Sequence, residues 1–93
     1  MKITLRTFAD FREIIGIREK EISLPDGETV GGLLKGLCKT HPTLQEKLFD
    51  AGAKLKPYVI ILKNGRNIAS LHHIDTVIED GDVIALFPPV AGG

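Results

Sequence analysis

The chain has 93 residues, 43% hydrophobic and 26% charged, an ordinary composition for one globular domain. Twelve basic residues balance twelve acidic ones, which argues against a nucleic-acid-binding module, since such modules usually carry a basic excess. The single cysteine, Cys38, cannot form an internal disulfide, so a disulfide-stapled secreted scaffold is not indicated. With no signal-peptide pattern and no apolar run that could span a bilayer, we expect a cytoplasmic protein without membrane contact that is a monomer when free.

Two strands are expected near the N-terminus. Apolar and polar side chains alternate from Lys2 to Phe8, and again from Glu19 to Leu24, where Pro25-Asp26-Gly27 ends the pattern. We expect these two strands to form a hairpin. The intervening segment from Phe11 to Ile15 is short and ends at Gly16, so we predict a loop or a single helical turn there.

The main helix is predicted from Val30 to about Thr40, because side chains recur there with a 3.6-residue period: Val30, Leu33, Leu34, Leu37, Cys38 and His41. Thr29 can cap its first turn, and Pro42 ends it, since the residue before a proline avoids the helical region. The helix also contains glycines but no Gly-Lys-Ser/Thr ending of a phosphate loop, so close packing explains them better: Gly31, Gly32 and Gly36. A shorter helix is expected around Leu44, Leu48 and Phe49, ending at Gly52.

Three further strands are expected in the second half. Tyr58 to Lys63 is closed by an Asn64-Gly65 turn, Ile68 to Ser70 is a short return strand, and the wholly apolar run from Val83 to Phe87 is typical of a central strand. The order predicts an α+β fold, a mixed four- to five-stranded sheet on one main helix, with the last strand parallel to the first. The expected core is Ile3, Leu5, Leu33, Leu34, Leu37, Ile60, Leu62, Ile84 and Leu86.

No active site is visible in the sequence. Cys38 lies on the apolar stripe of the main helix, where a cysteine is usually a small core residue rather than a nucleophile. His72 and His73 are adjacent and point apart in an extended segment, and His41 is distant, so we expect no metal site and no bound cofactor. An enzyme that uses Cys38 or the histidines remains a minor alternative.

The C-terminus is the unusual feature of the sequence. The expected central strand runs into Pro88-Pro89, which cannot continue a sheet, and then into Val90, Ala91, Gly92 and Gly93. We expect a domain over residues 1–89 and a flexible tail over residues 90–93. A carboxylate on Gly93 has no β-carbon beside it, so an enzyme can draw it through a narrow channel and adenylate it. This carboxylate is then a substrate rather than a catalyst.

Strand alternation predicts a docking surface beside the tail. If Ile84 and Leu86 face the helix, then Ala85 and Phe87 face the other way. The same parity places Arg6, Phe8, Val59, Ile61 and Lys63 on that outer face, which predicts an apolar patch with a basic fringe. We expect Phe87 to be its anchor; the alternative is a Phe87 buried under the Phe11–Ile15 loop.

The ending from Gly81 to Gly93, GDVIALFPPVAGG, resembles the signature of the MoaD/ThiS family of ubiquitin-like sulfur carriers, which includes the molybdopterin synthase small subunit and the small archaeal modifiers. The resemblance covers nearly the whole chain, including Leu24-Pro25-Asp26-Gly27 and the His41-Pro42 helix stop. It implies a β-grasp fold and ATP-dependent adenylation of Gly93 by a ubiquitin-activating-type enzyme.

The resemblance implies two fates for the activated end, a thiocarboxylate that donates sulfur or an isopeptide bond to a lysine of a target protein. Implied partners are the activating enzyme, target lysines and a molybdopterin synthase large subunit. The expected partner-binding residues are Phe8, Ile61, Phe87, Pro88, Pro89, Val90 and Ala91, with Gly92 and Gly93 activated. The alternative from another class is a β-grasp interaction module with an idle tail.

Overall fold

The computed structural model describes residues 1–89. The strands are β1 (Lys2–Thr7), β2 (Glu19–Ser23), β3 (Ile60–Lys63), β4 (Arg66–Asn67) and β5 (Val83–Phe87). The helices are α1 (Ala9–Ile15), α2 (Val30–Thr40) and α3 (Leu44–Leu48), with two 3₁₀ helices, η1 (Ile68–Ser70) and η2 (His73–Asp75). None of the helices in this range is long and apolar enough to cross a membrane.

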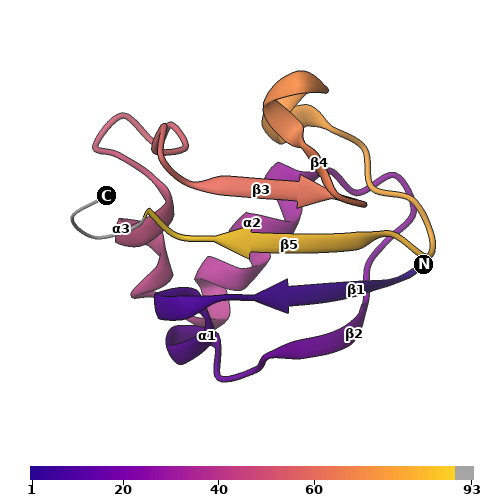
Figure 1. The fold of residues 1–93 in the computed structure, drawn as a ribbon, viewed down its shortest axis with the longest axis horizontal. Coiled ribbons are helices and arrows are strands. Elements are labelled where there is room, and N and C mark those ends of the chain that lie inside the picture. Colours follow the sequence, from indigo (N-terminus) through magenta and orange to yellow (C-terminus); the bar gives the residue numbers. More distant parts are fainter. Residues whose placement is uncertain (90–93) are drawn as a thin grey trace.

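The five strands form one mixed sheet in the order β2-β1-β5-β3-β4, with β5 in the centre (Figure 1). Strands β1 and β2 form the predicted antiparallel hairpin, and β5 pairs with β1 in parallel, as predicted. On its other side β5 pairs with β3 in antiparallel register. Because β1 and β5 are parallel, both strands end at the same edge of the sheet (Figure 1).

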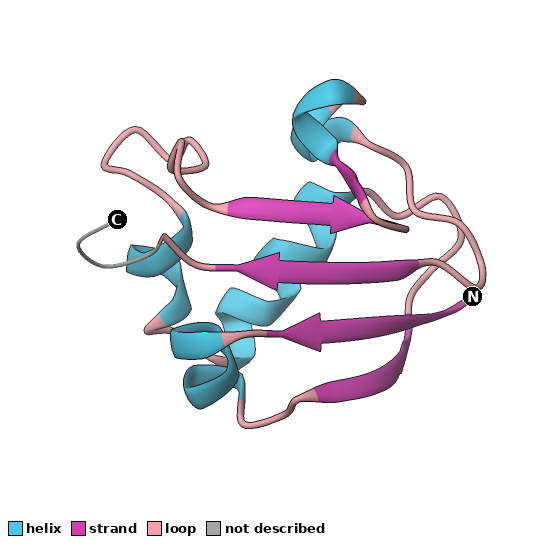
Figure 2. Cartoon of the chain, viewed as in Figure 1, coloured by secondary structure: helices cyan, strands magenta, loops and turns pink. Residues whose placement is uncertain are grey.

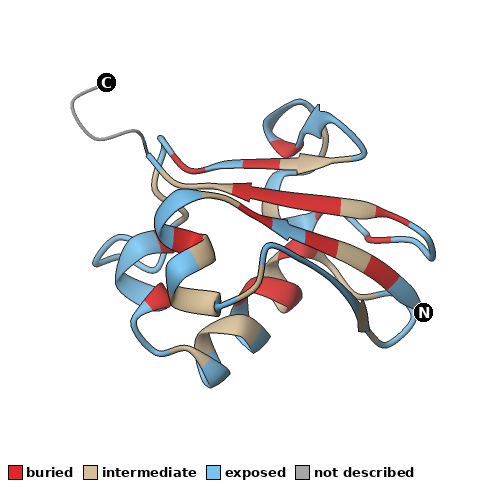
Figure 3. Ribbon diagram, turned by 60° about the horizontal axis from the view of Figure 1, so that its bottom comes forward, coloured by how far each residue is buried: buried red, intermediate tan, exposed pale blue. Residues whose placement is uncertain are grey.

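The helices lie on one face of this sheet, so the molecule has two layers (Figures 2 and 3). Between the layers is one core of buried apolar side chains, and six of the nine predicted core residues belong to it: Ile3, Leu5, Leu33, Leu34, Ile84 and Leu86. Leu37 packs against this core and is half-buried. The two predicted members from β3, Ile60 and Leu62, are not buried.

Helix α2 has the predicted bounds and cap. The Thr29 hydroxyl accepts a hydrogen bond from the Gly32 amide at 3.1 Å, and His41 is the C-cap. The close-packing explanation holds for Gly31, where an added Cβ would lie 3.1 Å from the Ile74 carbonyl oxygen, but not for Gly36, which has open space around it.

Two elements differ from expectation. The segment around Phe11 is part of a seven-residue helix, α1, rather than a loop or a single turn. The Phe11 side chain is fully buried, and tertiary packing of this kind stabilises a helix that would not form alone. The predicted strand Ile68–Ser70 is instead the 3₁₀ helix η1, since the Asn67 side chain accepts from the Ala69 amide at 2.9 Å and caps a helical turn.

The face assignment of β3 was wrong. Ile61 is 1% exposed and faces the core, whereas Ile60 is 44% exposed on the outer face. Val59 is also buried rather than exposed. The cause is that Val59 to Leu62 is uniformly apolar, so it contains no alternation from which a face could be read.

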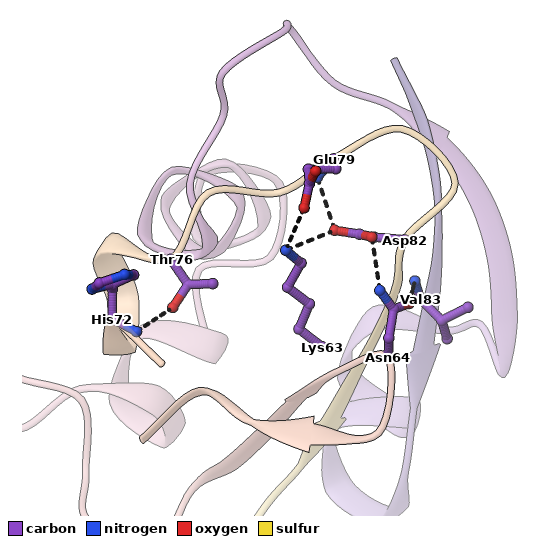
Figure 4. Close-up of polar contacts among 7 residues, drawn as sticks. All are labelled: Lys63, Asn64, His72, Thr76, Glu79, Asp82 and Val83. Atoms are coloured by element: carbon purple, nitrogen blue, oxygen red, sulfur yellow. Dashed lines mark hydrogen bonds and ion pairs between the residues drawn. The ribbon is translucent and has the colours of Figure 1, made fainter. Parts of the chain in front are cut away.

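Lys63 does not belong to the outer fringe either, because its side chain enters an ionic network at the opposite edge of the sheet (Figure 4). Its ammonium lies 2.9 Å from a Glu79 oxygen and 3.5 Å from an Asp82 oxygen. Asp82 is buried and also accepts from the Asn64 side-chain amide at 2.8 Å. The Asn64 oxygen in turn accepts from the Val83 amide at 2.8 Å, so the network fixes the start of β5.

We expect Ile61→Ala to lower the free energy of unfolding by about 2–5 kcal/mol, because it empties a packed core position. The neighbouring change Ile60→Ala is its control and should cost less than about 1 kcal/mol, since this side chain is half in solvent. Chemical denaturation of both variants measures the difference. Equal losses would contradict the observed face assignment.

The hydrogen bond to Glu79 raises the pKa of Lys63 above the ordinary lysine value. We expect Lys63→Met to lower the free energy of unfolding by about 1–2 kcal/mol at pH 7, since it leaves Asp82 without its cation. Because the pKa of Lys63 is higher in the folded than in the unfolded chain, its charge stabilises the fold fully at pH values below the unfolded-state pKa, near 10.4. This stabilisation is lost as the pH rises through the folded-state pKa.

The difference in the free energy of unfolding between wild type and Lys63→Met should therefore shrink above about pH 10.4 in denaturation experiments. Lys2→Met is the matched control, because Lys2 forms an exposed ion pair with Glu21 at 3.6 Å. A difference that stays constant with pH would contradict a role for the Lys63 charge.

Candidate functional site

A groove of about 400 Å³ lies where β1 and β5 end. Its lining is mainly apolar and comes from the β1–α1 junction, β3 and the end of β5; we call it the exit groove: Phe8, Ala9, Asp10, Ile60, Phe87, Pro88 and Pro89. Pro88 and Pro89 are the last residues that the structure describes, so the described part of the chain ends at this groove.

Two stacked aromatic rings form part of the lining of the exit groove. The rings of Phe8 and Phe87 lie 4.2 Å apart between centroids, with 9° between their planes. The register explains the contact: Thr7 of β1 is opposite Leu86 of β5, so the next residue of each strand falls side by side on the outer face. Ile60 is the partner of Phe87 on the other side, so the Phe87 side chain lies between two apolar neighbours.

Thr7, next to Phe8 in the sequence, forms hydrogen bonds to α1 and to the segment before β2. Its carbonyl oxygen accepts from Nε and Nη2 of Arg12, at 3.0 and 2.8 Å. Its hydroxyl donates to the Ile17 carbonyl, and its amide donates to the Arg18 carbonyl at 3.1 Å. The guanidinium of Arg12 also lies over the Phe8 ring, 5.4 Å from its centroid. The aromatic pair is therefore held from β1 and α1 at once.

The structure brings together four of the predicted partner-binding residues: Phe8, Phe87, Pro88 and Pro89. The Phe87 ring is half-buried against Phe8, so the alternative of a core Phe87 beneath residues 11–15 is wrong. Ile61 was wrongly included, since it is buried in the core, and its neighbour Ile60 takes its place. The remaining predictions, Val90, Ala91, Gly92 and Gly93, lie outside the described residues.

Sequence reasoning missed Ile60, Arg12 and Asp10 as neighbours of the exit. The sequence did hold a signal for Ile60: Tyr58, two residues earlier, points to the same face of an extended strand and has a polar tip that favours solvent. Tyr58 is 76% exposed. The predicted faces of β3 instead assumed that Lys63 points to solvent, whereas its charge is neutralised by Glu79 and Asp82. No comparable signal existed for Arg12, because its position depends on α1 being a helix.

The other candidate groups lie away from the exit groove. Cys38 is half-buried on α2, and burial raises the pKa of its thiol, the opposite of what a nucleophile needs. His41 caps α2, while His72 and His73 are exposed at the start of η2, as its N-cap and its first residue (Figure 4 shows His72). Across residues 1–89, no three His, Cys, Asp or Glu side chains gather as a metal-binding group.

The sequence and the fold are both similar to those of one family of small proteins. Residues 5–93 match the model of the ThiS family. Small archaeal modifier protein 3 of Haloferax volcanii is 41% identical over 93 residues, and the molybdopterin synthase sulfur carrier subunit of Chlamydomonas reinhardtii is 27% identical over 93 residues; both alignments cover all of each chain. The crystal structure of SAMP1 from Haloferax volcanii superposes with a TM-score of 0.84 at 32% identity, covering all of both chains.

These relatives are carriers and modifiers rather than catalysts. The mixed sheet packed on helix α2 is the ubiquitin-like β-grasp fold that the resemblance implied. The chain belongs to the ThiS family, among the ubiquitin-like sulfur carriers and small archaeal modifiers.

Proposed function

We propose that the working group of this protein is the Gly93 carboxylate, which a ubiquitin-activating-type enzyme adenylates while docked on the exit groove. The observation that carries the proposal is the direction of β5. The strand lies in the centre of the sheet and ends at Phe87. Pro88 and Pro89 follow it in the lining of the groove, and Gly93 is four residues after Pro89. A partner that covers the groove is therefore within reach of the chain end.

The chemistry uses the enzyme's ATP rather than a cofactor of this chain. A carboxylate oxygen of Gly93 attacks the α-phosphorus of ATP, and pyrophosphate leaves with the electron pair of the broken P–O bond. The acyl-adenylate then takes a sulfur or amine nucleophile at its carbonyl carbon and releases AMP. Because the reaction consumes ATP, we expect it in the cytoplasm.

Two products follow from the nucleophile. Sulfide that displaces AMP gives a C-terminal thiocarboxylate, the form in which a sulfur carrier would donate sulfur to molybdopterin or to tRNA. A lysine amine that displaces AMP gives an isopeptide bond, the product expected of a protein modifier. Both products require the same activation step and the same chain end. A molybdopterin synthase large subunit and target-protein lysines are the corresponding partners.

Deletion of Gly92-Gly93 should abolish adenylation and leave the free energy of unfolding unchanged, because the buried core lies within residues 1–89. Incubation with ATP and the activating enzyme from the same organism, followed by mass spectrometry of the C-terminus, measures the first effect. Thermal or chemical denaturation measures the second.

The matched control adds one alanine after Gly93, which retains the diglycine but moves the carboxylate. This variant should also fail to react. Adenylation of either variant at the wild-type rate would contradict the proposal. A wild-type chain that binds a partner on the groove but is never activated would favour the interaction module with an idle tail.

Phe87→Ala should weaken binding to the activating enzyme by about 2 kcal/mol, or roughly 30-fold in Kd, as expected for an aromatic anchor. It should lower the free energy of unfolding by less than about 1.5 kcal/mol, because the ring is only half-buried. Calorimetric titration and denaturation of the same preparation measure both quantities.

Val77→Ala is the control, since Val77 is another exposed apolar residue (50%) and lies outside the exit groove. It should leave the affinity unchanged. If Phe87→Ala destabilises the domain strongly while binding at low temperature is unaffected, the docking role is wrong.

A further inference from the structure

A second hollow, of about 250 Å³, adjoins the exit groove across the ring of Phe8, which lines both. Three arginines and one glutamate make up the rest of its lining, and we call it the arginine hollow: Arg6, Arg12, Arg18 and Glu19. Three guanidinium groups and one carboxylate leave two net positive charges in a chain whose formal charge is zero.

The fold builds this concentration of charge around Thr7. Arg6 precedes Thr7 on β1, Arg12 donates twice to its carbonyl oxygen, and the Arg18 carbonyl accepts from its amide. Residues from β1, α1 and the segment before β2 are thereby brought to one place. These hydrogen bonds to Thr7 hold the three segments together although the arginine charges repel one another.

The arginines retain unused hydrogen-bonding capacity. Two of the five N–H donors of Arg12 go to Thr7, and this contact together with the Phe8 ring holds the guanidinium in place. Arg6 has an exposed pair with Glu19 at 3.0 Å, a kind of contact worth little in solution. Within residues 1–89, Arg18 forms no ion pair at all.

We propose that the arginine hollow binds a carboxylate side chain of the activating enzyme, so that an ionic contact stands beside the apolar contact at Phe87. This inference rests on the proposed function. Guanidinium groups match carboxylates in a planar, two-bonded geometry, and Arg12 keeps three N–H donors besides the two that bind the Thr7 carbonyl. A bound carboxylate also offsets the repulsion among three cations, which the single Glu19 does not balance.

The size and composition of the hollow favour an acidic side chain over a nucleic acid. A nucleic-acid strand is bound through a series of phosphates along a basic track, whereas here the charge is confined to one small hollow that includes an acidic residue. Because the ring of Phe8 lines both hollows, a partner that docks on the exit groove lies next to the arginine hollow. Charge complementarity at such a rim accelerates association and fixes orientation.

The test uses the full chain, the activating enzyme and three variants. Arg18→Gln, which breaks no ion pair seen in residues 1–89, should raise Kd about 3- to 10-fold and reduce its salt dependence, and Arg18→Glu should raise it further by repulsion. Arg66→Gln on β4, outside the hollow, is the matched control and should leave Kd unchanged. Denaturation of each variant checks that the domain remains folded.

A covalent readout identifies the partner group. In the Arg18→Lys variant, a carbodiimide that activates enzyme carboxylates should join the new amine to one Asp or Glu of the enzyme through an amide bond, with release of the urea. Mass spectrometry of the peptides locates that residue. Arg66→Lys should give no such cross-link.

The outcomes separate the two proposals. A wild-type chain that neither binds the enzyme nor is adenylated overturns the proposed function and this inference with it. Normal wild-type binding with unchanged affinity of both Arg18 variants overturns the inference alone. Displacement of the enzyme by a single-stranded oligonucleotide would assign the hollow to phosphates, and a cross-link between two copies of this chain would assign it to a dimer; either result overturns the inference.

Discussion

The parallel pairing of β1 with β5 is the constraint on which the rest of the structure depends. It places the last strand in the centre of the sheet, where β5 pairs with a strand on each side. It also aligns Phe8 with Phe87, since each follows a residue of the matched Thr7–Leu86 pair. The aromatic pair in the exit groove and the direction of β5 therefore share one cause.

The same pairing places the exit groove and the arginine hollow next to each other, at the end of β5. Thr7 is the last residue of β1, and its backbone and hydroxyl groups bind α1 and the segment before β2. The arginines of those segments consequently border the Phe8 ring. For the activation proposed at Gly93, an apolar anchor next to a charged rim is suited to orienting the partner.

The fold could be predicted from the sequence where side-chain patterns are strong. Alternation in residues 2–8, the 3.6-residue stripe of α2 and the apolar run of β5 were sufficient for the topology and for six core positions. The face of β3 could not be predicted, because an all-apolar run has no parity and the Lys63 charge is neutralised by residues sixteen or more positions away in sequence. Helix α1 was missed for a related reason: its stability comes from the burial of Phe11 rather than from a local pattern. Of the site, Phe8, Phe87 and the prolines were predictable, and the arginine hollow, which needs three segments to converge, was not.

The central claim is that one surface, the exit groove with the arginine hollow, meets the activating enzyme. Amide chemical-shift mapping of the isotope-labelled chain, with and without the enzyme and without ATP, tests it most directly. The account predicts that the perturbed amides cluster at Phe8–Arg12, Arg18, Ile60 and Ala85–Phe87. Perturbations centred instead on the opposite edge of the sheet, around Asp26 and Asp80, or on the exposed side of α2, would contradict it.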